Sequence, residues 1–253
     1  MHFLKYLIPA WLLVLGVALP AQAAPFTVAI AANLKYVFDD LAAEFKKETG
    51  IEAQSVLNAS GKIATQIRQG APFDVFLSAD MEFPEGLYKE GFAVTPAKPY
   101  AYGVLVLWTQ KDVDLSKGVA GLVEPAVSKI AIANPKVAPF GKQALNAMAF
   151  YKVKSALEPK LVYGESITQV SQYVDTKTVD VGFSAKSIVI APETAGKGKW
   201  VAVPEESYEP IAQGMVILKH GIENQPDAAR KFYGFVQSAK AREIFAQYGY
   251  KLP

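Results

Sequence analysis

The 253-residue sequence contains no cysteine and only two histidines, His2 and His220. Without cysteine there are no disulfide bonds, so packing alone must stabilise the fold. Zinc and other soft metal ions prefer thiolate and imidazole ligands, so we expect no resident site for such an ion. A Ser-His-Asp triad would need His220, which follows a strand-like run and precedes a glycine. We interpret His220 as a solvated loop residue.

The sequence also lacks a basic block, an acidic tail and any low-complexity segment. Its 26 Lys and Arg residues nearly balance its 24 Asp and Glu residues. Removing Lys5 together with the leader described next leaves 25 basic residues against 24 acidic ones. Proteins that bind nucleic acid carry clustered positive charge, so nucleic acid is not an expected partner.

A long apolar run occurs only near the N-terminus. Lys5 precedes an almost wholly apolar stretch at residues 7–19, and Ala-Gln-Ala at residues 21–23 forms a small-x-small site. This pattern predicts a cleaved secretory signal peptide over residues 1–23, with the mature chain starting near Ala24. The run is shorter than the roughly 20 residues of a membrane span, which argues against an anchor. We therefore expect an exported protein.

Strand-like apolar runs alternate with helical patterns along the rest of the chain, as is typical of βαβ units and parallel sheets. The chief runs lie at residues 26–31, 51–57, 73–78, 102–109, 129–133, 160–163, 179–184, 200–203 and 212–218. A polar connection after Thr109 separates two alternating sets. We predict an α/β fold with residues 24–108 plus 210–253 as lobe I and 109–209 as lobe II. The runs at 104–108 and 212–218 are expected to be adjacent strands at the crossings.

Four strand-to-helix junctions repeat one pattern, at Asn33, Ser60, Phe140 and Ile167. A helix N-terminus holds free N–H groups and a partial positive charge. The Ser60 hydroxyl and the Asn33 amide can each cap a helix or donate to a small anion, whereas Phe140 and Ile167 offer only backbone N–H groups. Ligands in open α/β sheets bind outside the carboxyl ends of the strands. Two facing lobes would bring the four junctions together, and this repetition favours an oxyanion site.

Several segments resemble the periplasmic molybdate-binding proteins of ABC transporters, and the resemblance covers essentially the whole mature chain. These segments are Ala31-Ala32-Asn33, Asn58-Ala59-Ser60-Gly61, the block from Gly70 to Asp80, Asn134-Pro135 with Ala138-Pro139-Phe140-Gly141, and Tyr248-Gly249-Tyr250. The resemblance implies a two-lobed type II periplasmic binding protein fold in which each lobe is a mostly parallel sheet flanked by helices.

The resemblance also implies that the lobes close on molybdate or tungstate. Carried over by position, the ligands are Asn33 and Ser60 of lobe I, and Phe140 and Ile167 of lobe II through backbone N–H groups. Molybdenum enters only as the oxyanion, and neither a cofactor nor a catalytic activity is expected. The protein would be a periplasmic monomer that delivers its ligand to an inner-membrane ABC permease.

Two positions depart from the family pattern. Ala32 stands where one branch has Thr, and Ala185 stands where another branch has a ligand Tyr, so Ala185 supplies no hydroxyl as a fifth side-chain donor. Ser184 is a weak substitute for that donor. Glu165 lies close to one junction, and we expect its carboxylate to point to solvent.

Two alternatives remain open at this point. A sulfate-binding protein would use the same neutral donors and is hard to separate by sequence. An enzyme using the cleft would need a nucleophile with a base, or paired carboxylates. Asp74 and Asp80 lie on or just after one strand-like run and have no visible partner.

Overall fold

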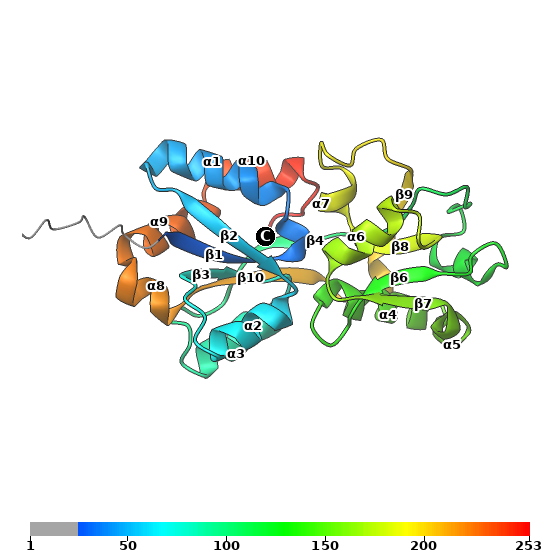
Figure 1. Ribbon diagram of the computed structural model, residues 1–253, viewed down its shortest axis with the longest axis horizontal. Helices are drawn as coiled ribbons and strands as arrows, with labels where there is room; N and C mark the ends of the chain where they lie inside the picture. The colour runs from blue at the N-terminus through cyan, green and yellow to red at the C-terminus, as the bar shows by residue number, and fades with distance from the viewer. Residues whose placement is uncertain (1–24) are drawn as a thin grey trace, which may run out of the picture.

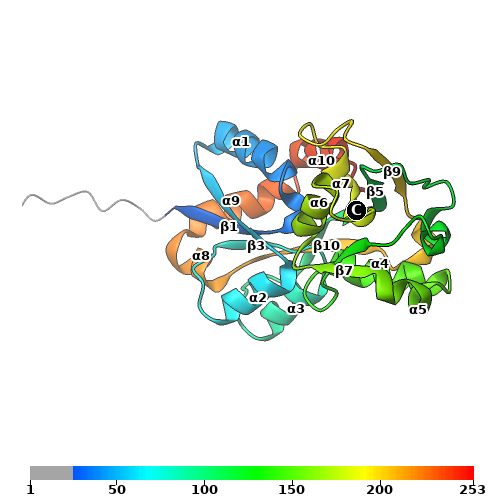
Figure 2. The same cartoon turned by 45° about the vertical axis from the view of Figure 1, so that its right-hand side comes forward.

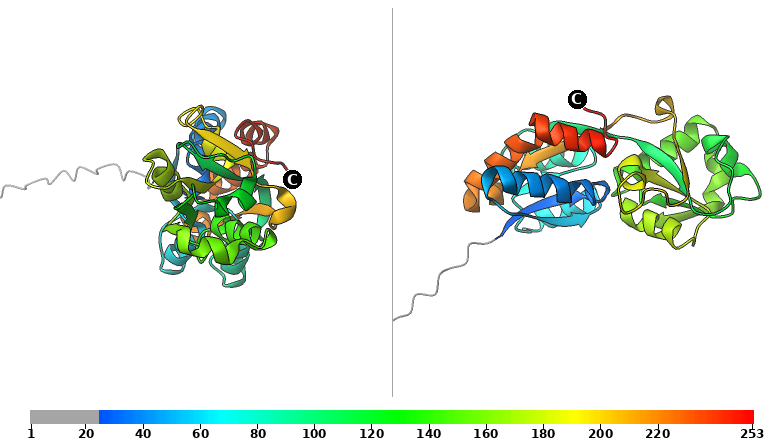
Figure 3. Two further views of the ribbon diagram at one scale, coloured as in Figure 1. Left: turned by 90° about the vertical axis from the view of Figure 1, so that its right-hand side faces the viewer. Right: turned by 90° about the horizontal axis from the view of Figure 1, so that it is seen from above.

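The computed structural model describes residues 25–253, which form two α/β lobes side by side (Figure 1). The chain crosses between the lobes twice, as the view from above shows (Figure 3). Each lobe is built on a five-stranded sheet flanked by helices, which confirms the predicted two-lobed α/β fold. The predicted signal peptide at 1–23 and the predicted start at Ala24 lie outside the described residues.

The first sheet has the strand order β2-β1-β3-β10-β4, and we call it and its helices lobe I. Its strands are β1 (Phe26–Ala31), β2 (Ala53–Asn58), β3 (Val75–Leu77), β4 (Lys98–Gly103) and β10 (Ile211–Ile217). β1 runs parallel to β2 and β3, whereas β10 is antiparallel to β3 and β4. The register pairs Ala31 with Asn58, so the carboxyl ends of β1 and β2 meet at one edge.

The second sheet has the order β7-β6-β8-β5-β9 and defines lobe II. Its strands are β5 (Leu105–Thr109), β6 (Ile130–Ala133), β7 (Leu161–Gly164), β8 (Val181–Ala185) and β9 (Lys199–Ala202). β6 is parallel to β7 and β8, and β5 is antiparallel to β8 and β9. Both sheets therefore contain one strand that runs against the others.

The boundary between the lobes lies one strand earlier than we expected from the sequence. The sequence pattern places residues 104–108 in lobe I, next to the run at 212–218. In the structure the chain leaves lobe I at Val104, and β5 pairs with β8 and β9 of lobe II. β10 pairs with β3 and β4 instead. The apolar pattern continues through the crossing without a polar turn, so hydrophobicity alone hides it.

Helices follow the strands in both lobes. Lobe I carries α1 (Val37–Thr49), α2 (Ser60–Arg68), α3 (Glu82–Lys89), α8 (Lys219–Asn224), α9 (Pro226–Val236) and α10 (Ala239–Gln247). Lobe II carries α4 (Pro139–Phe150), α5 (Lys154–Leu157), α6 (Ile167–Asp175) and α7 (Lys186–Val189). Short 3-10 helices are η1 (Ala32–Leu34), η2 (Gly118–Val123), η3 (Glu158–Lys160) and η4 (Glu205–Ser207).

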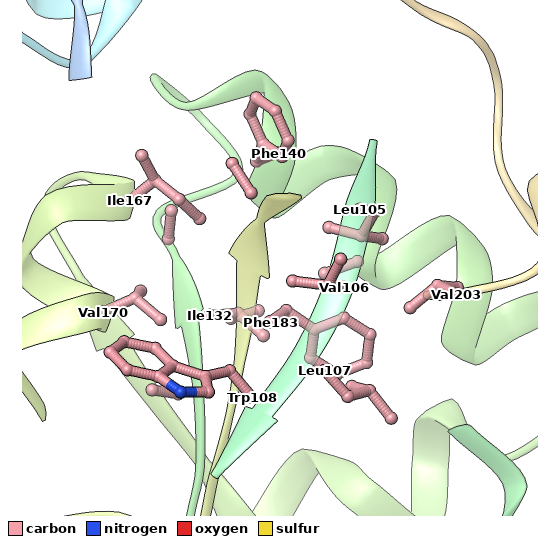
Figure 4. Close-up of a cluster of buried hydrophobic side chains, with 14 of the residues drawn as sticks. Leu105, Val106, Leu107, Trp108, Ile132, Phe140, Ile167, Val170, Phe183 and Val203 are labelled. Carbon is pink, nitrogen blue, oxygen red and sulfur yellow. The ribbon is translucent and has the colours of Figure 1, made fainter. Parts of the chain in front are cut away.

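The lobes have separate apolar cores that touch at the boundary between them. In lobe I, Phe232 of α9 packs edge-on against Phe45 of α1, with ring centroids 5.1 Å apart. In lobe II, the buried side chains of β5, β6 and β8 form the cluster drawn in Figure 4. Ala31, Ala59 and Ala79, at the carboxyl ends of lobe I strands, pack against that lobe II cluster. The two lobes are therefore closed against each other around the strand ends.

Candidate functional site

A small cavity between the lobes brings together all four residues predicted from the junctions. Its lining residues are Ala31, Ala32, Asn33, Ala59, Ser60, Ala79, Ala138, Pro139, Phe140 and Ile167. None of these side chains is ionisable, and the polar ones are the Asn33 amide and the Ser60 hydroxyl. A larger crevice nearby, lined by Lys35, Glu193 and Lys197 among others, contains none of the four.

The strand directions explain this convergence. β1 runs toward lobe II, so its carboxyl end faces the boundary (Figure 2). η1 begins directly after β1, and α2 begins two residues after β2. In lobe II, α4 and α6 follow β6 and β7 after short loops. The four helix N-termini thus lie at the facing edges of the two sheets, where open α/β sheets bind ligands.

Ser60 does not cap its helix. It is the first residue of α2, the N-cap position is Ala59, and no side chain accepts the cap hydrogen bond. Instead the Ser60 Oγ accepts a hydrogen bond of 3.0 Å from the backbone N–H of Ala79. This contact uses a lone pair and leaves the hydroxyl proton to be donated. The capping interpretation of Ser60 is therefore wrong, and the buried hydroxyl remains a donor that lines the cavity.

Asn33 is also not a cap, because Ala31 holds the N-cap position of η1. Its Nδ2 donates to the Oε1 of Gln213 at 3.0 Å and to the hydroxyl of Tyr250 at 2.9 Å. Its Oδ1 is buried without a hydrogen-bond partner. The side-chain donation to an anion that we expected is thus directed into the protein instead. The donor of Asn33 that suits an anion is its backbone N–H in the first turn of η1.

A buried polar network holds Asn33 in place. Tyr100 directs its hydroxyl to the Oε1 of Gln213 at 2.8 Å and to the carbonyl of Ser78 at 2.9 Å. Tyr250 donates to the backbone carbonyl of Asn33 at 3.0 Å. Burial raises the pKa of the Tyr100 and Tyr250 hydroxyls, so both stay protonated and can donate. No local sequence pattern marks Tyr100 or Gln213, and Tyr250 is marked only by the closing Tyr-Gly-Tyr segment.

Phe140 and Ile167 present their backbones to the cavity from helix starts. Phe140 is the second residue of α4, and Ile167 is the first residue of α6. Their N–H groups lie in the first turn and have no carbonyl one turn earlier to accept them. Ser166 is the N-cap of α6 and accepts from the N–H of Gln169 at 3.3 Å.

The side chains of Phe140 and Ile167 belong to the lobe II core. Both are buried, with exposed fractions of 2% and 4%. Figure 4 shows them at the end of the cluster toward which β8 points, with Trp108 at the other end. Gly141 allows this packing, since a Cβ there would lie 1.9 Å from the carbonyl oxygen of Ala133. The first turn of α4 is thereby seated directly on the end of β6.

The departures from the family pattern are also located. Ser184 is buried in lobe II, with its Oγ 3.3 Å from the Oγ of Ser171, and it does not line the cavity. The suggestion that Ser184 is a substitute donor is therefore wrong, and the Ala185 side chain has no donor group. The side chain of Glu165 is 61% exposed, as expected, but it forms an ion pair of 2.5 Å with Lys62 of lobe I.

His220 and Asp74 form a pair that the sequence did not reveal. His220 lies on α8, and its Nδ1 is 2.9 Å from the Oδ1 of the fully buried Asp74. Thr27 donates its N–H to the other oxygen of Asp74 at 2.7 Å. The interpretation of His220 as a solvated loop residue, and of Asp74 as lacking a partner, is therefore wrong. The pairing joins residues 146 positions apart, which local patterns cannot show.

This pair does not make a catalytic triad. Asp74 immediately precedes β3 and Thr27 lies near the start of β1, so the pair is at the sheet edge opposite the cavity. In the part of the chain that the structure describes, no Ser or Thr hydroxyl is hydrogen-bonded to the His220 ring. Within residues 25–253 there is also no group of three or more His, Asp or Glu residues that could hold a metal ion.

Comparison with known proteins agrees with the geometry. A family described as bacterial extracellular solute-binding protein matches residues 26–251. The molybdate-binding protein ModA of Rhodobacter capsulatus is 41% identical over 239 residues, covering 94% of this chain and 92% of that protein. No helix among residues 25–253 is long and apolar enough to cross a membrane.

Two solved structures are similar throughout. The periplasmic molybdate-binding protein of Azotobacter vinelandii superposes with a TM-score of 0.83 at 31% identity, over 90% of this chain and 99% of that one. The substrate-binding domain of a putative molybdenum ABC transporter from Clostridium difficile gives 0.66 at 28% identity, with the same coverage. The chain therefore belongs to the bacterial extracellular solute-binding protein family.

Proposed function

We propose that the protein binds molybdate, and tungstate, between its lobes as the periplasmic solute-binding component of an ABC importer. The observation that carries this proposal is the meeting of four helix N-termini at one cavity without an ionisable side chain. Two relatives are named as molybdate-binding proteins, and a third as the substrate-binding domain of a putative molybdenum ABC transporter, which supports the proposal. The protein is a carrier without catalytic activity, and it uses no cofactor.

The ligand donors are the Ser60 hydroxyl and the backbone N–H groups of Asn33, Phe140 and Ile167. Molybdate is a tetrahedral dianion with four acceptor oxygens and, at neutral pH, no proton to donate. A site made of neutral donors matches it, whereas a carboxylate acceptor would favour a protonated anion. Hydrogen bonds to a charged group contribute roughly 1.5–3 kcal/mol each. Four of them contribute roughly 6–12 kcal/mol, and the upper end of that range corresponds to nanomolar affinity before the cost of closure.

Selectivity follows from size, because sulfate carries the same charge with shorter bonds to oxygen. The donors are held on two separate sheets, and a smaller anion cannot reach all of them at once. Neither lobe satisfies the anion alone, so the ligand binds the closed arrangement better and shifts the population toward it. The closed protein, a monomer in the periplasm, is the form that delivers molybdate to the membrane permease.

A thermal-shift comparison tests the proposal. The mature protein is melted with the sodium salts of molybdate, tungstate, sulfate and phosphate at equal ionic strength. Molybdate and tungstate at about 100 times their Kd stabilise the folded state by about 2.7 kcal/mol and raise the Tm. Sulfate and phosphate leave the Tm where it is. Equal shifts with sulfate would show a broader oxyanion-binding protein, and the absence of any shift would contradict the proposal.

A further inference from the structure

Besides the ion pairs Lys62–Glu165 and Lys142–Glu82, which also join the lobes, three hydrogen bonds cross beside the cavity and end on backbone carbonyls. The N–H of Gly61 donates to the carbonyl of Val137 at 2.9 Å. The hydroxyl of Thr168 donates to the carbonyl of Ala32 at 3.2 Å. The hydroxyl of Ser187 donates to the carbonyl of Asn33 at 3.0 Å. These bonds exist only while the lobes are closed, and none of them needs the anion.

The contact of Gly61 with Val137 leaves no room for a side chain at position 61. A Cβ on Gly61 would lie 2.9 Å from the Cα and 3.1 Å from the Cβ of Val137, and 2.8 Å from the Cζ of Phe83. The Phe83 ring belongs to the same lobe as Gly61 and is the end of a movable side chain. Val137 belongs to the other lobe, and the contact there is with its backbone. Any side chain at position 61 therefore holds the lobes apart.

The partner of Gly61 is presented on a rigid turn. Asn134 accepts hydrogen bonds at its carbonyl from the N–H groups of Val137 at 3.1 Å and Ala138 at 2.8 Å. Its Oδ1 accepts a further bond of 3.1 Å from the N–H of Lys136. The turn cannot retreat from position 61 without breaking these bonds. Separation of the lobes is the available way to relieve a clash.

We propose that these three bonds form a latch, and that Gly61 determines ligand affinity through lobe closure without contacting the anion. The proposal builds on the molybdate-binding function proposed above. When only the closed form binds tightly, the apparent Kd equals the intrinsic Kd divided by the closed fraction. The latch raises the closed fraction in the absence of ligand, so less of the free energy of anion binding is needed to close the lobes.

The test compares two glycine-to-alanine variants by calorimetry. In Gly61→Ala the molybdate Kd rises at least about tenfold, because overpacking opposes the closed form. Gly234→Ala is the matched control, since Gly234 lies within α9 and a Cβ there meets nothing within 4 Å. Gly234→Ala should not lower the Tm of the ligand-free protein, because alanine favours a helix over glycine. Equal affinities in the two variants would overturn the proposal.

Two further variants test the hydroxyl bonds. Thr168→Val and Ser187→Ala each remove one donor and keep nearly the same volume, and each raises the molybdate Kd by roughly two- to tenfold. Neither residue lines the cavity, so a direct contact with the anion does not explain such a loss. Affinities equal to wild type in both variants would show that these bonds do not favour closure.

Closure itself is measured by energy transfer between dyes on introduced cysteines. The natural chain has no cysteine, so replacements of the exposed residues Glu48 in lobe I and Ser155 in lobe II are labelled uniquely. Without ligand, the distance distribution of Gly61→Ala is shifted to more open values than that of Gly234→Ala. This readout remains valid if molybdate binds none of the proteins, which would contradict the proposed function alone. Identical ligand-free distributions would overturn the latch.

Discussion

Ser60 shows how a single hydroxyl can be prepared for an anion before the anion arrives. The N–H of Ala79 donates to its Oγ, which fixes the rotamer and occupies a lone pair. The remaining capacity of the hydroxyl is one proton to donate. Fixing the donor in advance lowers the entropy that binding must remove. The N–H of Ala79, on another segment of the chain, therefore makes the Ser60 hydroxyl favour a ligand that accepts hydrogen bonds.

Ser60→Ala should lower the affinity for molybdate by roughly 10- to 150-fold, equivalent to about 1.5–3 kcal/mol for a hydrogen bond to a charged group. Calorimetric titration measures the loss, and circular dichroism confirms that the variant is folded. Ser238→Ala is the control, because Ser238 caps α10 by accepting from Ala241 and lies far from the cavity in sequence and in fold. The control should lose about 1 kcal/mol of stability and keep its affinity. An unchanged Kd in Ser60→Ala would count against the site.

At the scale of the element, one residue in the first turn of α4 has two roles: its backbone serves ligand binding and its side chain serves stability. Phe140 offers its N–H to the cavity while its ring fills the lobe II core (Figure 4). From the sequence we expected the side chain to matter little for binding. The structure adds that the same ring is 2% exposed, so it matters for folding.

Phe140→Ala should destabilise the protein by about 3–5 kcal/mol, because the ring leaves a cavity in the core. Its molybdate Kd, measured at a temperature where the variant is folded, should change by less than about threefold, since the backbone donor is retained. Denaturant unfolding and calorimetry give the two quantities. Phe150 lies on the same helix, and its ring is 54% exposed. Phe150→Ala should therefore change neither the free energy of unfolding nor the molybdate Kd by much. A large loss of affinity in Phe140→Ala without a matching loss of stability would show that the ring contacts the ligand.

Elements with a clear start and a regular apolar period could be predicted from the sequence. β1, α2, α4 and α6 lie where the apolar runs and the junction residues indicated. The division between β4 and β5 could not be predicted, because the apolar pattern is unbroken there. The short helices α7 and α8 were also missed, and they carry Ser187 and His220. One turn of helix has too few residues to show a period.

The same limit applies to the site. The four positions of the site could be predicted from local strand-to-helix junctions. The roles of their individual atoms could not be predicted. Asn33 is paired with Gln213 and Tyr250, which are 180 and 217 residues away, and these partners take up its side-chain donors. Contacts between the lobes, such as that of Gly61 with Val137, are equally remote. Only the folded chain shows which of a residue's groups remain available.

At the scale of the whole molecule, the electrostatics of the cleft are set by what borders it. The cavity itself has no ionisable lining, but Asp80 directly follows Ala79 at its edge. The carboxylate accepts hydrogen bonds from the Ser78 hydroxyl at 3.0 Å and from the N–H of Phe83 at 3.2 Å. Burial nevertheless raises its pKa to about 6. Glu82 raises this pKa slightly further, and Lys142 from lobe II opposes the rise.

The affinity for molybdate should therefore depend on pH through Asp80. Above its pKa of about 6 the carboxylate is ionised and repels a bound dianion, so affinity increases as the pH falls through that value. By linkage, the bound anion raises the pKa of Asp80 in turn. Without ligand, the native state binds this proton more readily than the unfolded chain, so stability decreases as the pH rises from about 4 to about 6.

Asp80→Asn tests this directly, because the amide keeps an acceptor for Ser78 and Phe83 but cannot ionise. Tungstate and molybdate Kd values are measured by calorimetry between about pH 5.5 and pH 8. As the pH rises over this range, the affinity of wild type should decrease, whereas the affinity of the variant should not change. The variant should also bind more tightly than wild type at the upper end. Glu85→Gln controls for an exposed carboxylate on the same helix, α3, and should keep the wild-type slope. If wild type and Asp80→Asn share one profile, the anion is bound too far from Asp80 to sense its charge.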